Sequence, residues 1–316
     1  MKVLRVGGNA GPCVLLFGLG LIGGAVDRAL RLRFQAEGRD FPYDWQDAGL
    51  RQAQRKDIGA ALPQAGRLAV VWTGGQSGFA SSDADMAQET AIVAELIAMA
   101  ETLRHGGRSV DFHMMSSAGG LFESQTHCSE LSIPRPLRPY GAGKLMQERA
   151  LAQAGGLDRR HVYRPSSVYG VTRSKRVGLV TALISNAMQG RTTQIFGNPN
   201  TLRDYVLADD IGHYLARRIV GAGALADPAP DHLPDPEHDR GPLTFLLASG
   251  RSASVFEVIE RIRERIERPL LLQFDPHPSN VRDMSFLPSA LPSDWQPTPL
   301  ASGISRIVTF LRSGLT

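Results

Sequence analysis

Short apolar runs alternate with longer segments of helical periodicity through the first two thirds of the chain. The apolar runs predict strands at Cys13–Phe17, Leu68–Trp72, Val110–Met115 and His161–Arg164. The longer segments predict helices at Gly23–Arg33, Glu89–Leu103 and Lys144–Gln153. Strands that are separated by helices pair in parallel and carry helices on both faces of their sheet. The pattern therefore predicts an α/β protein with a doubly wound parallel sheet.

The last third of the chain follows a different pattern. Residues 223–242 are rich in proline and aspartate and predict a surface loop. Phe245–Ala248 predicts a further strand. The sequence Ser254-x-x-Glu257 is a capping box, and it opens a helix with one apolar face. The residues of that face are Val255, Val258, Ile259, Ile262 and Ile266.

Composition and charge narrow the classes of protein to consider. Hydrophobic residues make up 42% and charged residues 21% of 316 residues, and the net charge is only +4, which suits a small anionic ligand better than nucleic acid. The two cysteines, Cys13 and Cys128, form no disulfide framework or metal-ligand spacing, so we expect no metal and a reducing cytoplasm. The apolar segment 13–26 contains four glycines and is followed by Asp27, so we expect neither a signal peptide nor a membrane span.

A glycine-rich motif stands between the first predicted strand and the first predicted helix. It reads Gly18-Leu19-Gly20-Leu21-Ile22-Gly23. Glycines at this spacing permit a tight turn and let the backbone approach a pyrophosphate, and the helix N-terminus offers free N–H groups to the anion. The same motif alone also occurs in ordinary tight turns. Its strand–turn–helix context favours a dinucleotide site of the Rossmann type.

An acidic residue about 20 positions further on would bind the ribose hydroxyls of NAD. Asp44 stands 21 residues after Gly23, at the end of the candidate second strand Phe41-Pro42-Tyr43-Asp44. Asp40 and Asp47 are alternatives, and all three could equally be solvated loop carboxylates. A carboxylate at this place favours NAD, but the neighbouring Arg39 and Arg51 leave NADP open.

The most informative chemical feature is the sequence Tyr140-Gly141-Ala142-Gly143-Lys144. Side chains at positions i and i+4 of a helix share one face, so the Lys144 ammonium would stabilise the phenolate of Tyr140 and make it a usable base. The pair follows a strand that ends in Ser116-Ser117, and ligands of such sheets bind at the carboxyl ends of the strands. We therefore expect Ser117, Tyr140 and Lys144 to be the catalytic residues.

The order and spacing of these motifs resemble the extended short-chain dehydrogenase/reductase family, also called the NAD-dependent epimerase/dehydratase family. The resemblance covers about residues 13–312. Besides the glycine-rich loop and the segment from Pro139 to Leu145, it rests on four stretches. These are Ser116-Ser117-Ala118-Gly119-Gly120-Leu121-Phe122-Glu123, Arg164-Pro165-Ser166-Ser167-Val168-Tyr169-Gly170, Arg203-Asp204-Tyr205-Val206-Leu207-Ala208-Asp209-Asp210 and Asn280-Val281-Arg282.

The resemblance implies a role for each position. Ser117 would hydrogen-bond the reacting hydroxyl, Tyr140 would move its proton, and Lys144 would also hold the nicotinamide ribose. Arg203 and Arg282 would bind the diphosphate of a nucleotide sugar, for which a planar guanidinium is suited. The implied cofactor contacts also include Thr73, Gly74, Pro165, Ser166 and Val168, and the implied substrate contacts include Ser116 and Ser167.

The chain departs from the family pattern at several of these places. Phe17 replaces a further glycine of the loop, and the customary ribose-site aspartate aligns nearer Trp45 than Asp44. The family spacing puts Ala118 at the usual serine position, which leaves Ser117 or Ser116 to serve. Ser167 stands where many relatives have asparagine, and Trp72-Thr73-Gly74-Gly75 stands where they have His-Leu-Ala-Ala.

We expect a Rossmann-type domain in residues 1–170, with 204–222 packing back onto it, and a smaller substrate-binding domain in 171–316. The leading hypothesis for function is an NAD(P)-dependent nucleotide-sugar epimerase that works through a transient keto intermediate. The alternative is an NAD(P)H-dependent reductase of a keto-sugar or another carbonyl. A non-catalytic dinucleotide sensor fits less well, because such proteins commonly lose the Tyr/Lys pair. The resemblance also implies a homodimer formed through helices such as Glu89–Leu103 and Tyr140–Gln153.

Overall fold

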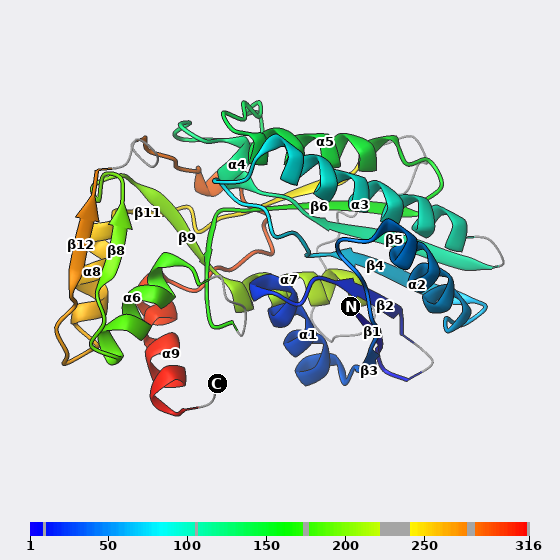
Figure 1. Ribbon diagram of the computed structural model, residues 1–316, viewed down its shortest axis with the longest axis horizontal. Helices are drawn as coiled ribbons and strands as arrows, with labels where there is room; N and C mark the ends of the chain where they lie inside the picture. The colour runs from blue at the N-terminus through cyan, green and yellow to red at the C-terminus, as the bar shows by residue number, and fades with distance from the viewer. Residues whose placement is uncertain (9–10, 105–106, 173–176, 222–240, 277–281, 315–316) are drawn as a thin grey trace.

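A computed structural model describes residues 1–8, 11–104, 107–172, 177–221, 241–276 and 282–314. Its centre is a seven-stranded sheet with the strand order β10-β6-β5-β4-β2-β1-β3 (Figure 1). Five neighbouring strands of this sheet run parallel. They are β2 (Cys13–Phe17), β4 (Gly66–Trp72), β5 (Arg108–Met115), β6 (Arg159–Pro165) and β10 (Leu243–Leu247). The predicted strands and their parallel pairing are confirmed.

The two remaining strands at one edge correct the sequence-based prediction. β1 (Lys2–Arg5) was not predicted, and it pairs antiparallel with both β2 and β3 (Glu37–Asp40), so it separates them. The candidate second strand at Phe41–Asp44 is wrong, because the strand ends at Asp40 and Pro42 cannot donate to a ladder. The backbones of β1 and β3 approach closely at Gly38, where an added Cβ would lie 2.2 Å from the Val3 carbonyl oxygen.

Helices cover both faces of the sheet, as the doubly wound pattern predicts. One face carries α1 (Leu21–Phe34) and α7 (Ala208–Val220), which pack against each other. Gly212 permits this contact, since a Cβ there would lie 2.5 Å from the carbonyl carbon of Ala25. The other face carries α2 (Ala48–Ala60), α3 (Asp83–Leu103) and α5 (Pro139–Gln153). Helix α7 thus packs on this face of the sheet.

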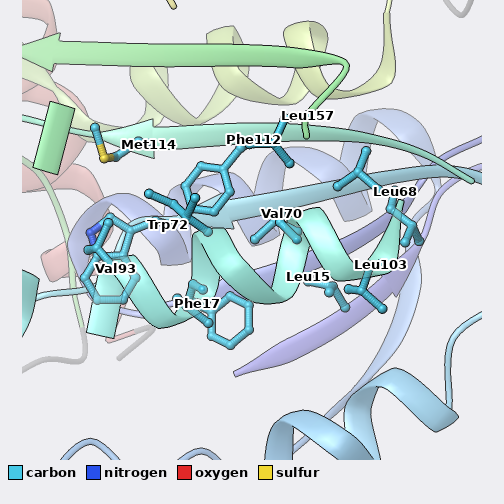
Figure 2. Close-up of a cluster of buried hydrophobic side chains, with 14 of the residues drawn as sticks. Leu15, Phe17, Leu68, Val70, Trp72, Val93, Leu103, Phe112, Met114 and Leu157 are labelled. Carbon is cyan, nitrogen blue, oxygen red and sulfur yellow. The ribbon is translucent and has the colours of Figure 1, made fainter. Parts of the chain in front are cut away.

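Side chains between the sheet and α3 form the largest core cluster (Figure 2). Alternate residues of the parallel strands point into it because successive strand side chains face opposite sides. Leucine, valine and aromatic residues dominate, and burying each of the larger ones contributes about 1.5–3 kcal/mol. The labelled members are Leu15, Phe17, Leu68, Val70, Trp72, Val93, Leu103, Phe112, Met114 and Leu157.

Helices α3 and α5 begin earlier than the periodicity predicts. Ser82 accepts from the Asp85 backbone N–H, and the Asp85 carboxylate accepts from the Ser82 backbone N–H, so a capping box starts α3 at Asp83. Helix α5 starts at Pro139, whose fixed φ angle and missing N–H suit the first turn of a helix. Tyr140 and Lys144 therefore both lie within α5.

A second group of elements lies at one end of the molecule (Figure 1). It has its own apolar core, which includes the predicted apolar face of the helix that begins after Ser254. The group consists of α6 (Leu179–Met188), β8 (Thr193–Phe196), α8 (Val255–Arg263), β12 (Leu272–Asp275) and α9 (Leu300–Arg312). A small sheet of β7 (Ser167–Tyr169), β9 (Arg203–Leu207) and β11 (Ser252–Ala253) joins it to the main sheet. The predicted loop 223–242 lies outside the described residues except for Gly241 and Pro242. The division into two domains stays a prediction.

Candidate active site

The glycine-rich loop connects β2 to the N-terminus of α1, as predicted. Gly18 has a φ angle of +92°, and a Cβ there would lie 2.3 Å from the Cα of Gly74. A Cβ on Gly23 would lie 1.8 Å from the carbonyl oxygen of Gly18. No side chain of the described residues caps α1, and its first turn carries no acidic residue. The free N–H groups and positive end of this helix therefore suit a phosphate group.

Thr73 and Gly74 hold the loop from the end of β4. The Thr73 hydroxyl donates to the Gly18 carbonyl at 2.7 Å, and the Thr73 N–H donates to the Phe17 carbonyl at 2.9 Å. The end of β4 and the glycine-rich loop thus form one rigid unit. Both residues lie against the glycine-rich loop, and their contact with a cofactor stays a prediction.

A cavity of about 660 Å³ opens beside this loop, within the size range of ligand pockets. The loop after β4 and the first half of α3 form its other walls. Its lining residues are Gly18, Leu19, Gly20, Trp45, Gln46, Trp72, Thr73, Gly74, Gly75, Gln76, Ser77, Ser81, Asp85, Gln88, Glu89 and Ile92.

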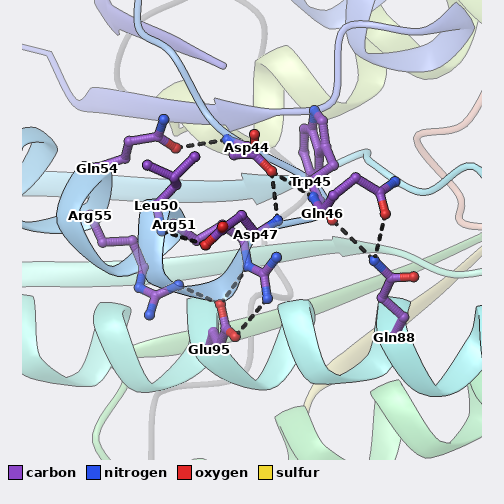
Figure 3. A network of polar contacts seen from close by, with 10 residues as sticks. All are labelled: Asp44, Trp45, Gln46, Asp47, Leu50, Arg51, Gln54, Arg55, Gln88 and Glu95. Atoms are coloured by element: carbon purple, nitrogen blue, oxygen red, sulfur yellow. Dashed lines mark hydrogen bonds and ion pairs between the residues drawn. The ribbon is translucent and has the colours of Figure 1, made fainter.

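Asp44 stands next to the cavity-lining residues but points its carboxylate into a turn (Figure 3). Its Oδ1 accepts from the backbone N–H groups of Gln46 and Asp47, both at 2.7 Å. The hydrogen bonds from Asp47 and Gln46 lower the pKa of Asp44. Asp47 in turn caps α2 by accepting from the Leu50 N–H at 2.9 Å. A ribose contact of Asp44 stays a prediction, and the residues whose side chains edge the cavity here are Trp45 and Gln46.

Tyr140 and Lys144 lie one turn apart on α5, as their spacing predicts. The Lys144 ammonium lies 5.8 Å from the centre of the Tyr140 ring. The ring is half-buried and makes an edge contact with Phe79, with ring centres 5.8 Å apart. This geometry lets the ammonium stabilise negative charge on the phenol.

A short helix brings Ser117 toward Tyr140. Ser117 follows the end of β5 and accepts from the Gly120 N–H at 3.0 Å, which starts α4 (Ala118–Leu121). The Tyr140 ring packs on Gly120, where a Cβ would lie 2.9 Å from the ring. The buried hydroxyl of Ser116 has no hydrogen-bond partner among the described residues. Ser117 and Ser116 thus both remain available for the serine role.

Glu89 is a site residue that the sequence did not reveal. The Lys144 ammonium donates to Glu89 Oε1 at 2.7 Å, and both side chains are buried. Burial by itself raises the pKa of Glu89. The Lys144 ammonium and the hydrogen bonds from Lys144, Gln147 and Ser77 lower it by more, so the pKa of Glu89 lies below its usual value. The two residues are 55 positions apart and belong to no shared motif, so no local pattern could have paired them.

Ser166 and Asp204 form a second buried pair. The Ser166 hydroxyl donates to Asp204 Oδ1 at 2.5 Å, and Asp204 also accepts from the N–H and hydroxyl of Ser249. Burial raises the pKa of Asp204, although these hydrogen bonds oppose the shift. Ser167 and Val168 follow in β7, whereas Pro165 ends β6. The Ser166 hydroxyl therefore donates its hydrogen bond inside the protein, and its cofactor contact stays a prediction.

The structure brings the two predicted substrate arginines together. Arg203 donates from Nη1 to the carbonyl of Arg282 at 2.5 Å and to that of Leu202 at 2.9 Å. Burial lowers the pKa of Arg203, whereas Arg282 is exposed. The Arg203 guanidinium thus binds the backbone of the Arg282 segment, and the diphosphate contact of the two arginines stays a prediction. Asn280 and Val281 of the same motif lie outside the described residues.

Metal-binding clusters and membrane-spanning helices are both absent from the part of the chain that the structure describes. In these residues no group of three or more histidine, cysteine, aspartate or glutamate side chains is placed to hold a metal ion. None of the helices in the described ranges combines the length and the apolar character needed to cross a membrane.

The parallel sheet, the glycine-rich loop and the Tyr/Lys pair define the class of Rossmann-type enzymes. The chain belongs to the NAD dependent epimerase/dehydratase family, whose model matches residues 50–219. This confirms the resemblance and the NAD-dependent class. The match begins after β1 and β3, the part of the chain that departs from the expected strand order.

Relatives of known function and structure agree with this assignment. The UDP-glucose 4-epimerase of Mycolicibacterium smegmatis is 28% identical over 236 residues, which are 71% of this chain and 69% of that protein. The structure of RMD from Pseudomonas aeruginosa with NADPH has a TM-score of 0.70 at 19% identity and covers 95% of this chain and 99% of that one. The UDP-glucose 4-epimerase of Thermus thermophilus with NAD has a TM-score of 0.66 at 18% identity, covering 86% and 84%. The two structures establish the shared fold.

Proposed function

We propose that this chain is an NAD-dependent epimerase of a nucleotide sugar. The observation that carries the proposal is that Tyr140 and Lys144 lie one turn apart on α5, with the Tyr140 ring packed on Gly120 of the short helix that Ser117 caps. Sequence similarity to a UDP-glucose 4-epimerase supports the substrate class.

The glycine-rich loop fits a dinucleotide. The close backbone approaches at Gly18 and Gly23 and the uncapped start of α1 leave room and N–H groups for a pyrophosphate. Bound NAD supplies the hydride acceptor for oxidation of a sugar hydroxyl and the donor for re-reduction. The residues that would hold it are Gly18, Leu19, Gly20, Leu21, Ile22, Gly23, Thr73 and Gly74, with Lys144 at the nicotinamide ribose.

The side chains of this site divide the acid–base work. The Tyr140 phenolate would take the proton of the sugar hydroxyl, and the neutral phenol would give a proton back to the sugar oxygen when the keto intermediate is reduced. The Lys144 ammonium stabilises the phenolate, and the Ser117 hydroxyl donates a hydrogen bond to the sugar oxygen. Positioned acid–base groups of this kind typically contribute about 10²–10⁴-fold to the rate.

The test uses UDP-glucose with added NAD and follows formation of the C4 epimer by chromatography. Tyr140→Phe keeps the ring and removes the proton carrier, so turnover should fall by about 10²–10⁴-fold while NAD still binds. Tyr169→Phe is the matched control, because the Tyr169 hydroxyl is buried against Gly303 of α9. Full activity of Tyr140→Phe would contradict the assignment.

A reductase of a keto-sugar or another carbonyl is the second candidate, and one observation favours it. Trp45 and Gln46 edge the cavity where the Asp44 carboxylate was expected, and that carboxylate is bound in a turn instead of selecting for ribose hydroxyls over a 2′-phosphate. The similar structure from Pseudomonas aeruginosa binds NADPH. Titration with NAD and NADP distinguishes the candidates, and the dinucleotide that copurifies is a second measure. Tightly held NAD supports the epimerase, whereas preference for exchanging NADPH supports the reductase.

We further propose that the enzyme is a homodimer through α3 and α5. These helices lie side by side on one face of the sheet (Figure 1). Met146 of α5 is 57% exposed, so this helix presents apolar surface outward. Sedimentation of the wild type and of Met146→Glu tests the proposal, since a dimer through α5 should weaken in the variant.

A further inference from the structure

The carboxylate of Glu89 is fixed by donors from two different elements. Lys144 and Gln147 of α5 donate to its Oε1 at 2.7 and 3.2 Å, and the backbone N–H of Ser77 donates to Oε2 at 3.4 Å. The side chains of Lys144 and Glu89 are only 5% and 6% exposed. These three donors hold the Glu89 carboxylate in one place and in its ionised form.

Glu89 also borders the ligand cavity. The residue is part of the cavity wall, next to Gly75 and Ser77. A Cβ on Gly75 would lie 2.6 Å from Glu89 Oε2, so a glycine with a φ angle of +113° is needed for the carboxylate to occupy this position. One side chain therefore both contacts the lysine of the proposed acid–base pair and borders the cavity.

This arrangement changes the electrostatics expected of the Tyr/Lys pair. A buried ammonium 5.8 Å from the Tyr140 ring would by itself favour the phenolate strongly. A carboxylate 2.7 Å from that ammonium leaves the pair with no net charge. Because charges interact more strongly at low dielectric constant, the neutral pair stabilises the Tyr140 phenolate less than the ammonium alone would.

We propose that Glu89 is a positioning residue that holds Lys144 in place and offsets its charge at Tyr140, so that the phenolate forms at a higher pH than an unpaired lysine would allow. This inference rests on the proposed function in one respect, namely that Tyr140 carries out the proton transfer.

The other charged groups around the pair have hydrogen-bond or ion-pair partners of their own. Asp85 of α3 accepts from Ser82 within the capping box. Arg138, at the start of α5, binds Glu123 with both partners partly buried. Glu148 of α5 binds Arg164 of β6 at 2.6 Å. Glu89 is therefore the group whose removal changes the charge next to Lys144 while these three interactions remain.

The test is a pH titration of Tyr140 by the ultraviolet difference absorbance of tyrosinate, with the Tyr140→Phe protein as the reference for subtraction. In Glu89→Gln the titration midpoint should fall by about one pH unit, because a negative charge near the phenol is lost. In Lys144→Gln it should rise. In the double variant, which removes both charges, it should return to within a few tenths of a pH unit of the wild type. Glu95→Gln is the matched control, since Glu95 lies on the same helix and is ion-paired with Arg51 outside the cavity wall, and its midpoint should not move.

An unchanged or higher midpoint in Glu89→Gln would overturn the proposal. If that single variant does not fold, the double variant decides, because a midpoint as high as in Lys144→Gln would show that Glu89 contributes nothing. The titration needs no substrate and no turnover. If the midpoints shift as expected but the enzyme epimerises no nucleotide sugar, the proposed function is rejected. The role of Glu89 then still stands.

Discussion

The hydroxyl of Thr73 donates a 2.7 Å hydrogen bond to the carbonyl oxygen of Gly18. This bond joins the end of β4 to the phosphate-binding turn, and the same hydroxyl proton is shared with the Phe17 carbonyl oxygen, 3.1 Å away. The turn is thus held in its conformation before any ligand arrives, and such preorganisation lowers the cost of binding.

Thr73→Val should weaken binding of NAD while keeping the shape of the side chain. The variant loses both hydroxyl bonds and leaves the Gly18 carbonyl with one partner fewer. We expect a stability loss of about 1 kcal/mol and NAD binding weaker by about 5- to 10-fold. Calorimetric titration measures the affinity and urea unfolding the stability. Thr102→Val on the exposed face of α3, whose hydroxyl bonds only to Ala98, should leave NAD affinity unchanged. Equal affinities of wild type and Thr73→Val would show that the bond does not organise the loop.

Arg203→Ala should weaken binding of a nucleotide diphosphate by about 1.5–3 kcal/mol, the scale of a hydrogen bond to a charged group. Arg282→Ala should act in the same direction, because it removes an exposed guanidinium from the segment whose backbone carbonyl accepts from Arg203. Calorimetry with UDP measures both effects. Arg263→Ala, in an exposed ion pair of α8, serves as the control for loss of positive charge. If UDP and other nucleotide diphosphates fail to bind the wild type, the substrate class is wrong.

Glu89→Gln should destabilise the protein, and the loss should depend on pH. The folded pKa of Glu89 lies below its ordinary value of 4.5, so its stabilisation is present above that value and is lost as pH falls through the folded pKa. Near pH 7 the variant leaves Lys144 as a buried cation without its carboxylate, which costs about 3–5 kcal/mol.

Urea unfolding near pH 7 and again well below pH 4.5 measures this dependence. The gap between wild type and Glu89→Gln should shrink in acid. Glu95→Gln, whose carboxylate is 26% exposed and pairs with both Arg51 and Arg55, should show a smaller loss near pH 7. The same loss for Glu89→Gln at both pH values would mean that its cause is packing and not charge.

The periodicity of the sequence predicted the parallel strands and the main helices, because each of these has a local pattern. The short strand β1 escaped prediction because its partners are Cys13–Phe17 and Glu37–Asp40, and pairing between distant segments leaves no local signal. The same reason applies to the partners of the site. Tyr140 and Lys144 share a helix and could be found by spacing, whereas Glu89 and Asp204 meet Lys144 and Ser166 only in the folded chain.

The structure also leads us to expect that the enzyme does not eliminate water from a nucleotide hexose. The family resemblance implies that 4,6-dehydratases carry an acid and a base, as Asp-Glu, directly after the active-site serine or threonine. Here Ser117 is followed by Ala118 and Gly119, which cannot carry a proton. Glu123 is the first carboxylate after Ser117 along the chain, and it forms a two-bond ion pair with Arg138.

The Glu123–Arg138 ion pair lies beside the proposed site, and Arg138 already binds both carboxylate oxygens of Glu123. The Arg138 guanidinium lies 5.2 Å from the centre of the Phe79 ring, which contacts Tyr140. Each missing general acid or base forfeits about 10²–10⁴-fold in rate, so elimination should be undetectable while epimerisation proceeds. Mass spectrometry of UDP-glucose incubated with enzyme and NAD decides the matter. A product lighter by one water, formed as fast as the epimer and lost in Glu123→Gln, would make Glu123 a catalytic acid or base and refute this prediction.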